Sequence, residues 1–312
     1  MVTQPLFYFP SSIAWVDDDT SILEVAKLTF GEQYPLHCFN RPQEALSFFE
    51  KYLPPLSKVP FVLASVEDEY YATMDHFPID FNVLSVSQLV DLPKRNQEIS
   101  VVIVDYNMPE MTGLEFCRSL KNLPMKKILL TGEVGEREAV AAFNDNIIDR
   151  FIHKGSQEMI AELKTHLSSL MRQYFCERTH ALLSHLEVEA PTPLSDPLFI
   201  EFFQSWCQTH RITEYFIIDK IGSFLCFNER NERIYFVLHT ENTLKALLDF
   251  CSSENELQPF LSPLENREKL PFFGLGREGW LVEAHEWPSH FYPATPLKGR
   301  ELYYWAEVKE NN

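Results

Sequence analysis

The chain of 312 residues is short of several features, and each absence excludes a class of protein. No run of about 18 apolar residues occurs, so no segment is expected to insert into a membrane. The first residues have no basic region ahead of an apolar one, so no signal peptide is expected. The six cysteines include no C-x-x-C pair, which disfavours a zinc site and a disulfide framework and suits reduced thiols. These absences predict a cytoplasmic protein.

Basic residues are scarce as well. The chain has 27 Lys and Arg against 45 Asp and Glu, a formal net charge of −18. Proteins bind nucleic acids largely by neutralising phosphates with Lys and Arg, so no nucleic-acid partner is expected. Residues 191–312 repeat this balance, with 11 basic against 18 acidic residues. They also contain no helix-turn-helix, Gly-Gly-Asp-Glu-Phe, His-Asp or kinase motif, which makes an enzymatic output the weaker expectation.

What the sequence does contain is a series of apolar segments that end on polar residues. The clearest is Val101–Val104, whose β-branched residues are typical of a strand buried on both faces, followed at once by Asp105. Four such strands carry polar residues at their carboxyl ends, namely Asp17 with Asp18, then Asp105, Thr131 and Lys154. Open α/β sheets place their chemistry at this edge.

These residue types suit phosphoryl chemistry. A lone acid after a strand is usually a helix cap, but several clustered carboxylates repel one another, and Mg²⁺ is the usual counter-ion because it prefers oxygen ligands. One carboxylate can then attack a phosphoryl group as a nucleophile. An ammonium and a hydroxyl nearby can bind the transferred phosphoryl oxygens.

Residues 11 to about 170 resemble a response-regulator receiver domain. The resemblance rests on the Asp17-Asp18 pair, Asp105 with the Tyr-Asn-Met-Pro that follows it, Thr131 and Lys154, all in the order of that family. It implies that Asp105 accepts a phosphoryl group from a sensor histidine kinase or a phosphotransfer protein. It also implies that Mg²⁺ is held by Asp17, Asp18, Asp105 and the backbone carbonyl of Asn107.

The resemblance assigns further roles. Thr131 and Lys154 bind the phosphoryl group, Phe151 occupies the aromatic switch position, and Asn107 and Glu133 tune dephosphorylation. The chain departs from the family in two places. Gly155 follows Lys154 where the family has a proline in a cis peptide, and residues 53–98 form an insertion between a helix and the next strand.

The expected fold class is α/β: a flavodoxin-like, doubly wound five-stranded parallel sheet, then a long helix and a small α+β domain with an antiparallel sheet. The expected boundaries are 1–155 for the receiver, 156–190 for the last helix and linker, and 191–312 for the output domain. Residues 1–10 are an added edge strand or pack on the receiver surface. The insertion is expected to hold a hairpin and a short helix, as a docking surface or a solvated elaboration.

Apolar residues at helical spacing continue far beyond the last expected strand, from residue 156 to about 188. Ile160, Leu163, Leu167 and Leu170 share one face of that helix. The face is either a seam between protomers or a surface packed against the second domain. We expect a homodimer through residues 136–143 and 160–170.

Three features of residues 191–312 have a functional and a structural interpretation. Gly274-Leu-Gly-Arg-Glu-Gly279 has the G-x-G-x-x-G spacing of a nucleotide site but lacks the helix that must follow, so a turn is favoured. His285 and His290 with Glu283 are a possible metal set or isolated structural residues. The aromatic residues of the last 35 positions belong to a core or to a partner surface.

The sequence thus predicts a two-component response regulator whose output domain binds a protein or a ligand rather than DNA. The alternatives are an enzymatic or nucleotide-binding output, and a scaffold with a receiver that does not use phosphate.

Overall fold

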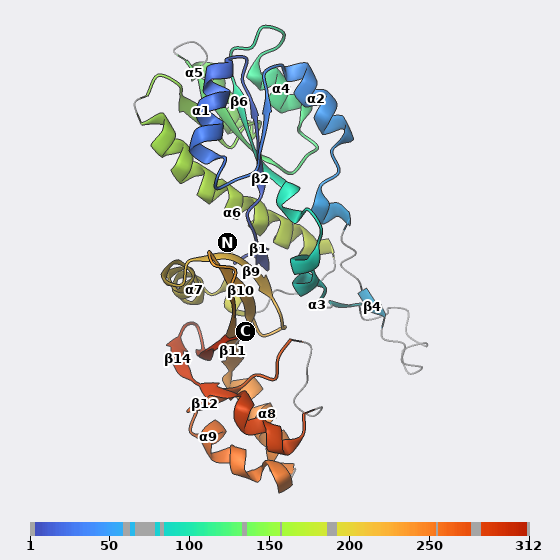
Figure 1. Ribbon diagram of the computed structural model, residues 1–312, viewed down its shortest axis with the longest axis vertical. Coiled ribbons are helices and arrows are strands. Elements are labelled where there is room, and N and C mark those ends of the chain that lie inside the picture. Colours follow the sequence, from blue (N-terminus) through green and yellow to red (C-terminus); the bar gives the residue numbers. More distant parts are fainter. Residues whose placement is uncertain are drawn as a thin grey trace. The chain divides into compact units, whose positions relative to one another are not determined.

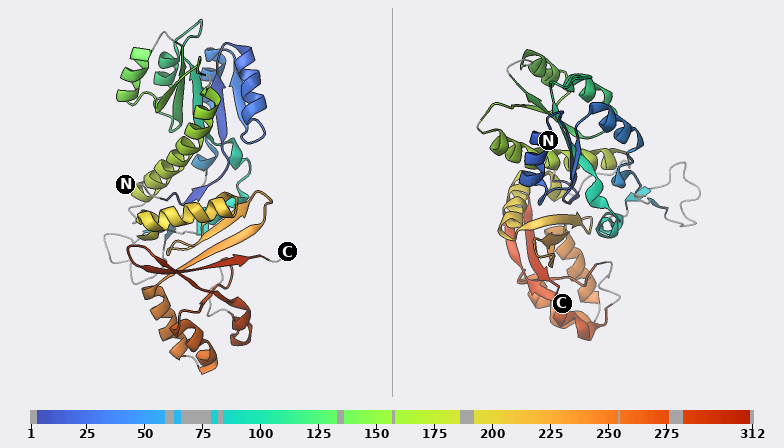
Figure 2. Two further views of the ribbon diagram at one scale, coloured as in Figure 1. Left: turned by 90° about the vertical axis from the view of Figure 1, so that its left-hand side faces the viewer. Right: turned by 45° about the horizontal axis from the view of Figure 1, so that its top comes forward.

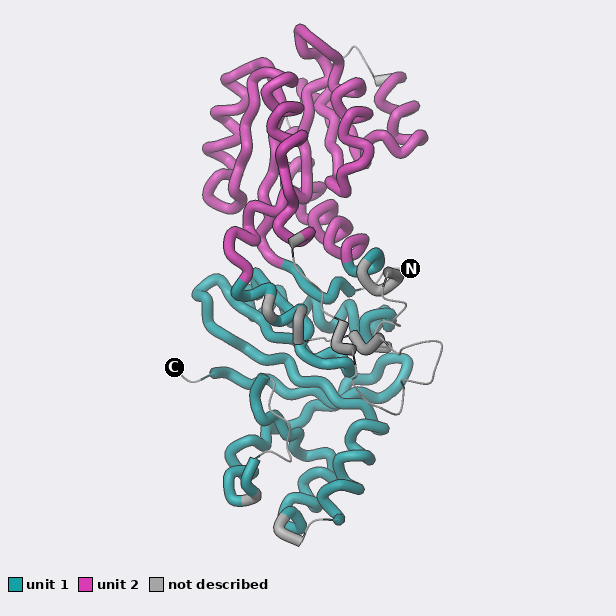
Figure 3. Tube along the Cα trace, turned by 90° about the vertical axis from the view of Figure 1, so that its right-hand side faces the viewer, with its two compact units in different colours: residues 1–8, 61–91, 179–312 teal, residues 9–60, 92–178 magenta. Residues whose placement is uncertain are grey.

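The computed structural model of the chain describes residues 4–58, 63–65, 79–81, 84–132, 136–156, 158–185, 192–253, 255–275 and 282–310. The chain forms two compact units, drawn in different colours in Figure 3. Unit 1 comprises residues 1–8, 61–91 and 179–312, and unit 2 comprises residues 9–60 and 92–178. Each unit is therefore assembled from segments that are separated in the sequence.

Unit 2 contains a five-stranded parallel sheet with the strand order β3-β2-β6-β7-β8. Its strands are β2 (Ser12–Val16), β3 (Leu36–Phe39), β6 (Ile99–Asp105), β7 (Lys126–Thr131) and β8 (Arg150–His153). The helices between them are α1 (Thr20–Phe30), α2 (Pro42–Lys51), α4 (Gly113–Ser119) and α5 (Glu136–Asn144), and α6 (Met159–His185) follows the last strand. Figure 1 shows these helices on both sides of the sheet, so the expected doubly wound α/β fold is confirmed.

The two faces of this sheet are covered separately because successive side chains of a strand point to opposite sides. Ala14 and Val16 lie in one cluster with residues of α2, α4 and α5. Trp15 points to the other side, where its ring lies 6.0 Å from that of Phe30 on α1. Burial on both faces explains why β2 and β6 read as continuous apolar runs.

Unit 1 is built on a six-stranded antiparallel sheet with the order β1-β9-β10-β11-β15-β14. Its strands are β1 (Phe7–Tyr8), β9 (Ile212–Ile217), β10 (Phe224–Asn228), β11 (Arg233–Thr240), β14 (Thr295–Lys298) and β15 (Leu302–Lys309). The expected antiparallel sheet of the C-terminal part is thereby confirmed. The N-terminal strand β1 pairs with β9, with Phe7 opposite Phe216. Of the two alternatives for residues 1–10, Phe7 and Tyr8 form an edge strand, but in this antiparallel sheet, where their backbone partner lies about 200 residues later.

Helix α7 (Pro197–Thr209) crosses one face of this sheet (Figure 2). Its Phe203 ring lies 4.5 Å from Phe224 and 5.2 Å from Phe236, so aromatic residues form the core between helix and sheet. The remaining elements are α8 (Glu241–Ser253), α9 (Leu261–Glu265) and the antiparallel pair of β12 (Lys269–Pro271) with β13 (Phe291–Pro293). Trp287, fully buried beside Phe273, shows that part of the C-terminal aromatic cluster is core.

The insertion contains the expected antiparallel pair, β4 (Leu63–Ser65) with β5 (Ile79–Phe81), and a short helix, α3 (Leu84–Ser87). Helix α3 packs against β9. The division into 1–155, 156–190 and 191–312 thus differs from the observed units, because residues 1–8 and 61–91 fold with the C-terminal part. Hydrogen bonds and packing across long sequence separations decide this, and local patterns do not reveal them.

The apolar face of α6 is part of the protein core. Leu163, Leu167 and Leu170 are fully buried within the chain. Packing within the chain therefore covers these three leucines, whereas Ile160 is half-buried. The dimer itself stays a prediction. Periodicity showed that one face of the helix is apolar but not what covers it. None of the helices that the structure describes is both long and apolar enough to cross a bilayer.

Candidate functional site

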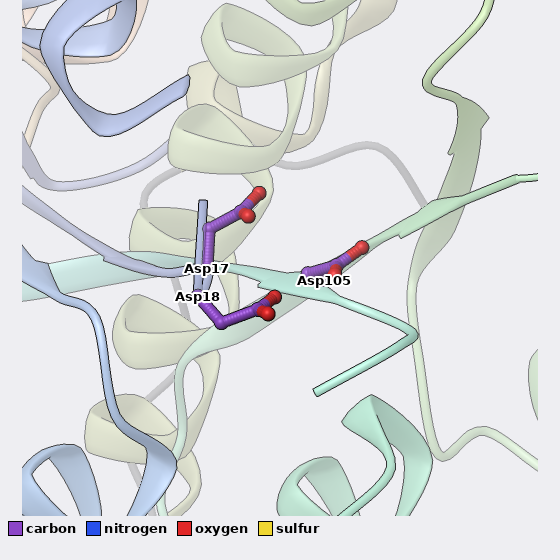
Figure 4. Close-up of side chains that lie close together, drawn as sticks. All are labelled: Asp17, Asp18 and Asp105. Carbon is purple, nitrogen blue, oxygen red and sulfur yellow. The ribbon is translucent and has the colours of Figure 1, made fainter. Parts of the chain in front are cut away.

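Three carboxylates gather at the carboxyl ends of two neighbouring strands. Asp17 and Asp18 follow β2 directly, and Asp105 is the last residue of β6, which pairs with β2 in parallel. Figure 4 shows the three side chains side by side. One oxygen of each lies within 4.8 Å of the others. The sequence predicted this grouping because parallel neighbouring strands end at the same edge of a sheet.

Asp17 is fully buried and Asp105 is 5% exposed, whereas Asp18 is exposed. Burial raises the pKa of the Asp17 and Asp105 carboxyls above their usual range, and repulsion between neighbouring carboxylates adds to this effect. Hydrogen bonds and ionic attraction from Lys154 oppose that rise without cancelling it. Three carboxylates lie together, and Lys154 is the one ammonium that pairs with them among the described residues. With all three ionised, the negative charge of the cluster exceeds the positive charge beside it.

Lys154 stands immediately after β8 and reaches both buried acids. Its Nζ lies 2.8 Å from Asp17 Oδ2 and 2.8 Å from Asp105 Oδ1. Burial tends to lower the pKa of this ammonium, but its hydrogen bonds to Asp105 and Asp17 outweigh burial and raise it. A hydrogen bond of 2.7 Å from Lys154 N to Thr131 O fixes the start of this loop on β7. Lys154 is thus a permanently charged donor held beside Asp105.

Thr131 ends β7, on the other side of β6 from Asp17. It is 1% exposed, and within the described residues its Oγ1 has no hydrogen-bond partner. An unpaired buried hydroxyl is costly, commonly by about 1–3 kcal/mol. A hydroxyl left open at the same sheet edge as Asp105 suits a ligand that supplies an acceptor.

The donor set fits a magnesium ion. All three clustered groups offer carboxylate oxygens, the hard ligands that Mg²⁺ prefers. A divalent cation would also offset the surplus negative charge described above. In the part of the chain that the structure describes, no other group of three or more His, Cys, Asp or Glu residues is arranged to hold a metal.

Asp19 belongs to a helix cap rather than to this cluster. Its carboxylate accepts hydrogen bonds from Ser21 N at 2.8 Å and Ser21 Oγ at 2.6 Å, so it caps α1. These hydrogen bonds lower the pKa of Asp19. The usual role of an acid after a strand therefore applies to the third acid of the run and not to the first two.

The segment after Asp105 is held by a capping box at the start of α4. Thr112 Oγ1 accepts a hydrogen bond from Glu115 N at 3.2 Å, and Glu115 Oε2 accepts one from Thr112 N at 2.8 Å. The T-x-x-E spacing before an apolar helix could have revealed it. At Gly113 a Cβ atom would lie 2.2 Å from the carbonyl oxygen of Asp105, so only glycine permits this close approach.

The other residues assigned by resemblance lie near this edge or outside the described residues. Asn107 is exposed, two positions beyond Asp105, and the role of its carbonyl remains a prediction. The Phe151 side chain on β8 is 39% exposed. Glu133 lies outside the described residues. The described residues contain no cis peptide bond, so the Lys154–Gly155 bond is trans.

The candidate motifs of the C-terminal half do not assemble into a comparable site. Gly276 to Gly279 of the glycine-rich segment lie outside the described residues. His285 Nε2 lies 3.9 Å from Glu286 Oε1, on an exposed surface. His290 Nδ1 lies 3.2 Å from Phe272 O. The two histidines and Glu283 therefore form no metal group in the described structure.

Comparisons with known proteins identify a receiver domain in this chain. The family model "Response regulator receiver domain" matches residues 74–166. Chemotaxis protein CheY homologs from strains of Campylobacter jejuni are 30% identical over 76 residues, which is 23% of this chain. The match spans 58% of the length of those relatives.

The likeness to one solved structure extends across both units. The Legionella pneumophila response regulator LqsR is 29% identical with a TM-score of 0.76, and the match covers 98% of this chain and 89% of that one. The family model covers the region that carries Asp105 and Thr131, whereas the likeness to this solved structure also includes the C-terminal part.

Proposed function

We propose that this chain, which contains a receiver domain of the two-component signalling type, accepts a phosphoryl group on Asp105. The donor is a sensor histidine kinase or a phosphotransfer protein. The observation that carries the proposal is a pair of donors at the sheet edge of Asp105. They are the Lys154 ammonium, 2.8 Å from Asp105 Oδ1, and the Thr131 hydroxyl, which has no hydrogen-bond partner among the described residues. In the proposed reaction, each of these two groups donates a hydrogen bond to an oxygen of the incoming phosphoryl group.

In this reaction an Asp105 carboxylate oxygen forms a bond to phosphorus while the bond from phosphorus to the donor breaks. The leaving group, an imidazole nitrogen if the donor is phosphohistidine, keeps the electron pair. Lys154 and Thr131 bind equatorial phosphoryl oxygens, where charge spreads in such transfers. Asp17, Asp18, Asp105 and the Asn107 carbonyl would hold Mg²⁺, which would supply the positive charge that an anionic carboxylate needs beside an anionic phosphoryl group.

The test is the intact mass of the protein after incubation with acetyl phosphate and Mg²⁺. We expect one adduct of about 80 Da in the wild type and none in Asp105→Asn or in the presence of EDTA. Asp145→Asn is the matched control, since it removes an exposed acid of the same unit, and it should be labelled like the wild type. An adduct that persists in Asp105→Asn, or a wild type that takes none, contradicts the proposal.

Asn107 and Glu133 are proposed to orient the water that hydrolyses the aspartyl phosphate. In the same assay Glu133→Leu should lengthen the life of the adduct. Equal decay of variant and wild type contradicts this role.

The proposed output is binding of a protein or a ligand by unit 1. Its acidic balance disfavours nucleic acid as the partner. The six cysteines are free thiols, which supports a reducing, cytoplasmic location as part of the proposal.

A homodimer also belongs to the proposal, through the face of α5 and β8. Val140, Phe143 and Phe151 are large apolar side chains with 47%, 40% and 39% exposure, whereas three residues of the 160–170 face are fully buried, namely Leu163, Leu167 and Leu170. Phosphorylation should strengthen this dimer by about 1–3 kcal/mol.

Sedimentation equilibrium with and without beryllofluoride measures this change in dimer stability. Phe143→Glu should abolish it, and Leu28→Glu, at an exposed apolar residue of α1, should preserve it. Equal effects of both variants contradict the assigned face.

A further inference from the structure

Unit 2 contains a cavity far from the carboxylate cluster. Its volume is about 550 Å³, within the usual range of small-molecule pockets. It is lined by His37, Phe48, Lys51, Tyr52, Leu53, Pro55, Leu92, Pro93, Lys94 and Gln97. Gln97 precedes β6 and Asp105 ends it, so the seven residues of that strand, about 20 Å, separate the cavity from the phosphoacceptor.

The cavity has an aromatic wall. The rings of Phe48 and Tyr52 stack with centroids 5.8 Å apart and planes 24° apart, and the His37 ring lies 5.3 Å from Phe48. Burial lowers the pKa of His37, so its imidazole is neutral near pH 7. Flat neutral rings of this kind pack well against a planar apolar ligand.

The wall is fixed by the backbone that precedes β6. The Tyr52 hydroxyl accepts a hydrogen bond from Ile99 N at 2.7 Å and donates one to Gln97 O at 3.2 Å. Because both capacities of the hydroxyl are used, Tyr52 presents its ring rather than a free polar group. A preformed wall reduces the cost of ordering side chains on binding.

The charged residues that line the cavity are all basic. Lys51 and Lys94 are exposed, and in the described part of the chain neither has a carboxylate within salt-bridge distance. No acid lines the cavity, although acids outnumber bases 45 to 27 in the whole chain. Lys94 adopts a φ of +61°, a left-handed conformation that is uncommon for residues other than glycine. The backbone at position 94 thus has a defined turn conformation, and this turn presents the Lys94 side chain to the cavity.

The insertion creates this cavity. Leu53, Pro55, Leu92, Pro93, Lys94 and Gln97 belong to residues 53–98. They lie in the two stems of segment 61–91, which we define as residues 53–60 before it and 92–98 after it. Segment 61–91 itself folds with unit 1. A receiver without such an insertion would lack these walls, so the cavity belongs to this chain rather than to the receiver fold in general.

We propose that this cavity binds a small aromatic carboxylate. The planar body packs between the Phe48–Tyr52 wall and the prolines and leucines of the two stems, and the carboxylate is met by Lys51 and Lys94. Because one bound molecule would contact both stems of segment 61–91, it would act as an input separate from phosphorylation of Asp105.

The test uses 2-naphthoate as the probe, with its intrinsic fluorescence titrated against the full chain. We expect saturable binding at one site. The neutral analogue 2-naphthalenemethanol and the cationic 2-naphthylmethylamine should bind at least about tenfold more weakly, because they cannot form the two ion pairs.

The variant Lys51→Gln with Lys94→Asn should weaken 2-naphthoate binding about tenfold without changing binding of the neutral alcohol. Asparagine is chosen because it tolerates the left-handed conformation at position 94. Lys121→Gln, which removes an exposed lysine outside the cavity, should bind like the wild type. Each variant must show the thermal midpoint and the acetyl phosphate labelling of the wild type.

Three results would overturn the proposal. They are a wild type without saturable 2-naphthoate binding, equal affinity for the acid and the alcohol, and equal affinity of the double variant and the wild type. Labelling of Asp105 is measured independently, so failure of this proposal is distinguishable from failure of the proposed function.

Discussion

The carboxylates of the two units differ in how well their surroundings satisfy them. In unit 2, Asp17 and Asp105 share one ammonium with each other, and the pKa of both is raised, chiefly by burial. In unit 1, Asp196 and Glu241 each have several donors of their own, and the pKa of both is lowered. Carboxylates that lack enough donors are typical of a site that binds a cation or another ligand. Carboxylates whose oxygens are fully hydrogen-bonded are typical of residues that stabilise the fold.

Asp196 illustrates the paired kind. It caps α7 through a bond from Leu198 N to Oδ1 at 3.0 Å, while Oδ2 accepts from Arg300 N at 2.5 Å and from Tyr303 Oη at 3.0 Å. Burial alone would raise its pKa, but these hydrogen bonds together lower it. At Gly299 a Cβ atom would lie 2.3 Å from Asp196 Oδ2, so the chain needs glycine there for this approach.

Glu241 is paired in a second way. Arg267 Nη2 lies 2.8 Å from its Oε2, and Tyr304 Oη donates to its Oε1 at 2.8 Å. Hydrogen bonds from Arg267 and Tyr304 lower the pKa of Glu241. These contacts connect α8, β15 and the segment after α9 within unit 1. Because both Glu241 oxygens have donors, this carboxylate has a structural role.

Removal of one carboxylate of each kind should change the stability of the protein by different amounts. Asp196→Ala should lower the free energy of unfolding of unit 1 by about 3 kcal/mol, because it removes a helix cap and leaves buried donors unpaired. Asp18→Ala should cost less than about 0.5 kcal/mol, since Asp18 is exposed in a cluster of like charge. Urea denaturation followed by tryptophan fluorescence measures both.

Asp249→Ala, at an exposed acid of α8, is the control for unit 1 and should behave like the wild type. If Asp18→Ala destabilised the protein as much as Asp196→Ala, the distinction between surplus and paired carboxylates would be lost.

Magnesium should affect one unit only. At about ten times its dissociation constant, Mg²⁺ should stabilise unit 2 by about 1.4 kcal/mol, because it binds the folded carboxylate cluster and not the unfolded chain. Asp18→Ala should lose this stabilisation, and Asp145→Asn should keep it. Thermal unfolding with added Mg²⁺ or EDTA is the measurement, and a response that survives in Asp18→Ala would place the ion elsewhere.

Glu98 provides the smallest test, because it is a buried acid of unit 2 with donors of its own. Its Oε2 accepts from Leu56 N at 2.9 Å and its Oε1 accepts from the Tyr174 hydroxyl, yet burial still raises its pKa above 4.5. A raised pKa means that the contribution of this carboxyl to stability is greatest below its unfolded pKa and is lost as the pH rises through the folded value.

Glu98→Gln mimics the protonated carboxyl and should therefore gain stability relative to the wild type between about pH 5 and pH 8. The free energy of unfolding of both proteins across that range is the measurement. Parallel curves would mean that Glu98 is already satisfied as a carboxylate, like Asp196.

Much of the phosphoacceptor site could be predicted from the sequence. Asp105, Thr131 and Lys154 each follow a buried strand, and parallel strands bring their carboxyl ends to one edge, so local patterns and one rule of topology are enough. Strand-end patterns alone could not distinguish Asp18 from Asp19, because both are acids that follow the same apolar segment. Only the hydrogen bonds from Ser21 show that the second one is a cap.

The sequence by itself therefore determined the strands, the helices and the residues at the sheet edge, since periodicity and strand ends are local properties. Only the tertiary structure decided that Phe7 pairs with Phe216, that Leu163 is covered by the chain itself, and that Lys51 and Lys94 line one cavity. The reason is that an apolar helix face must be buried and a strand edge must be hydrogen-bonded, but neither pattern shows which segment of the chain covers it. The partner is chosen by packing and hydrogen bonding among residues far apart in the chain.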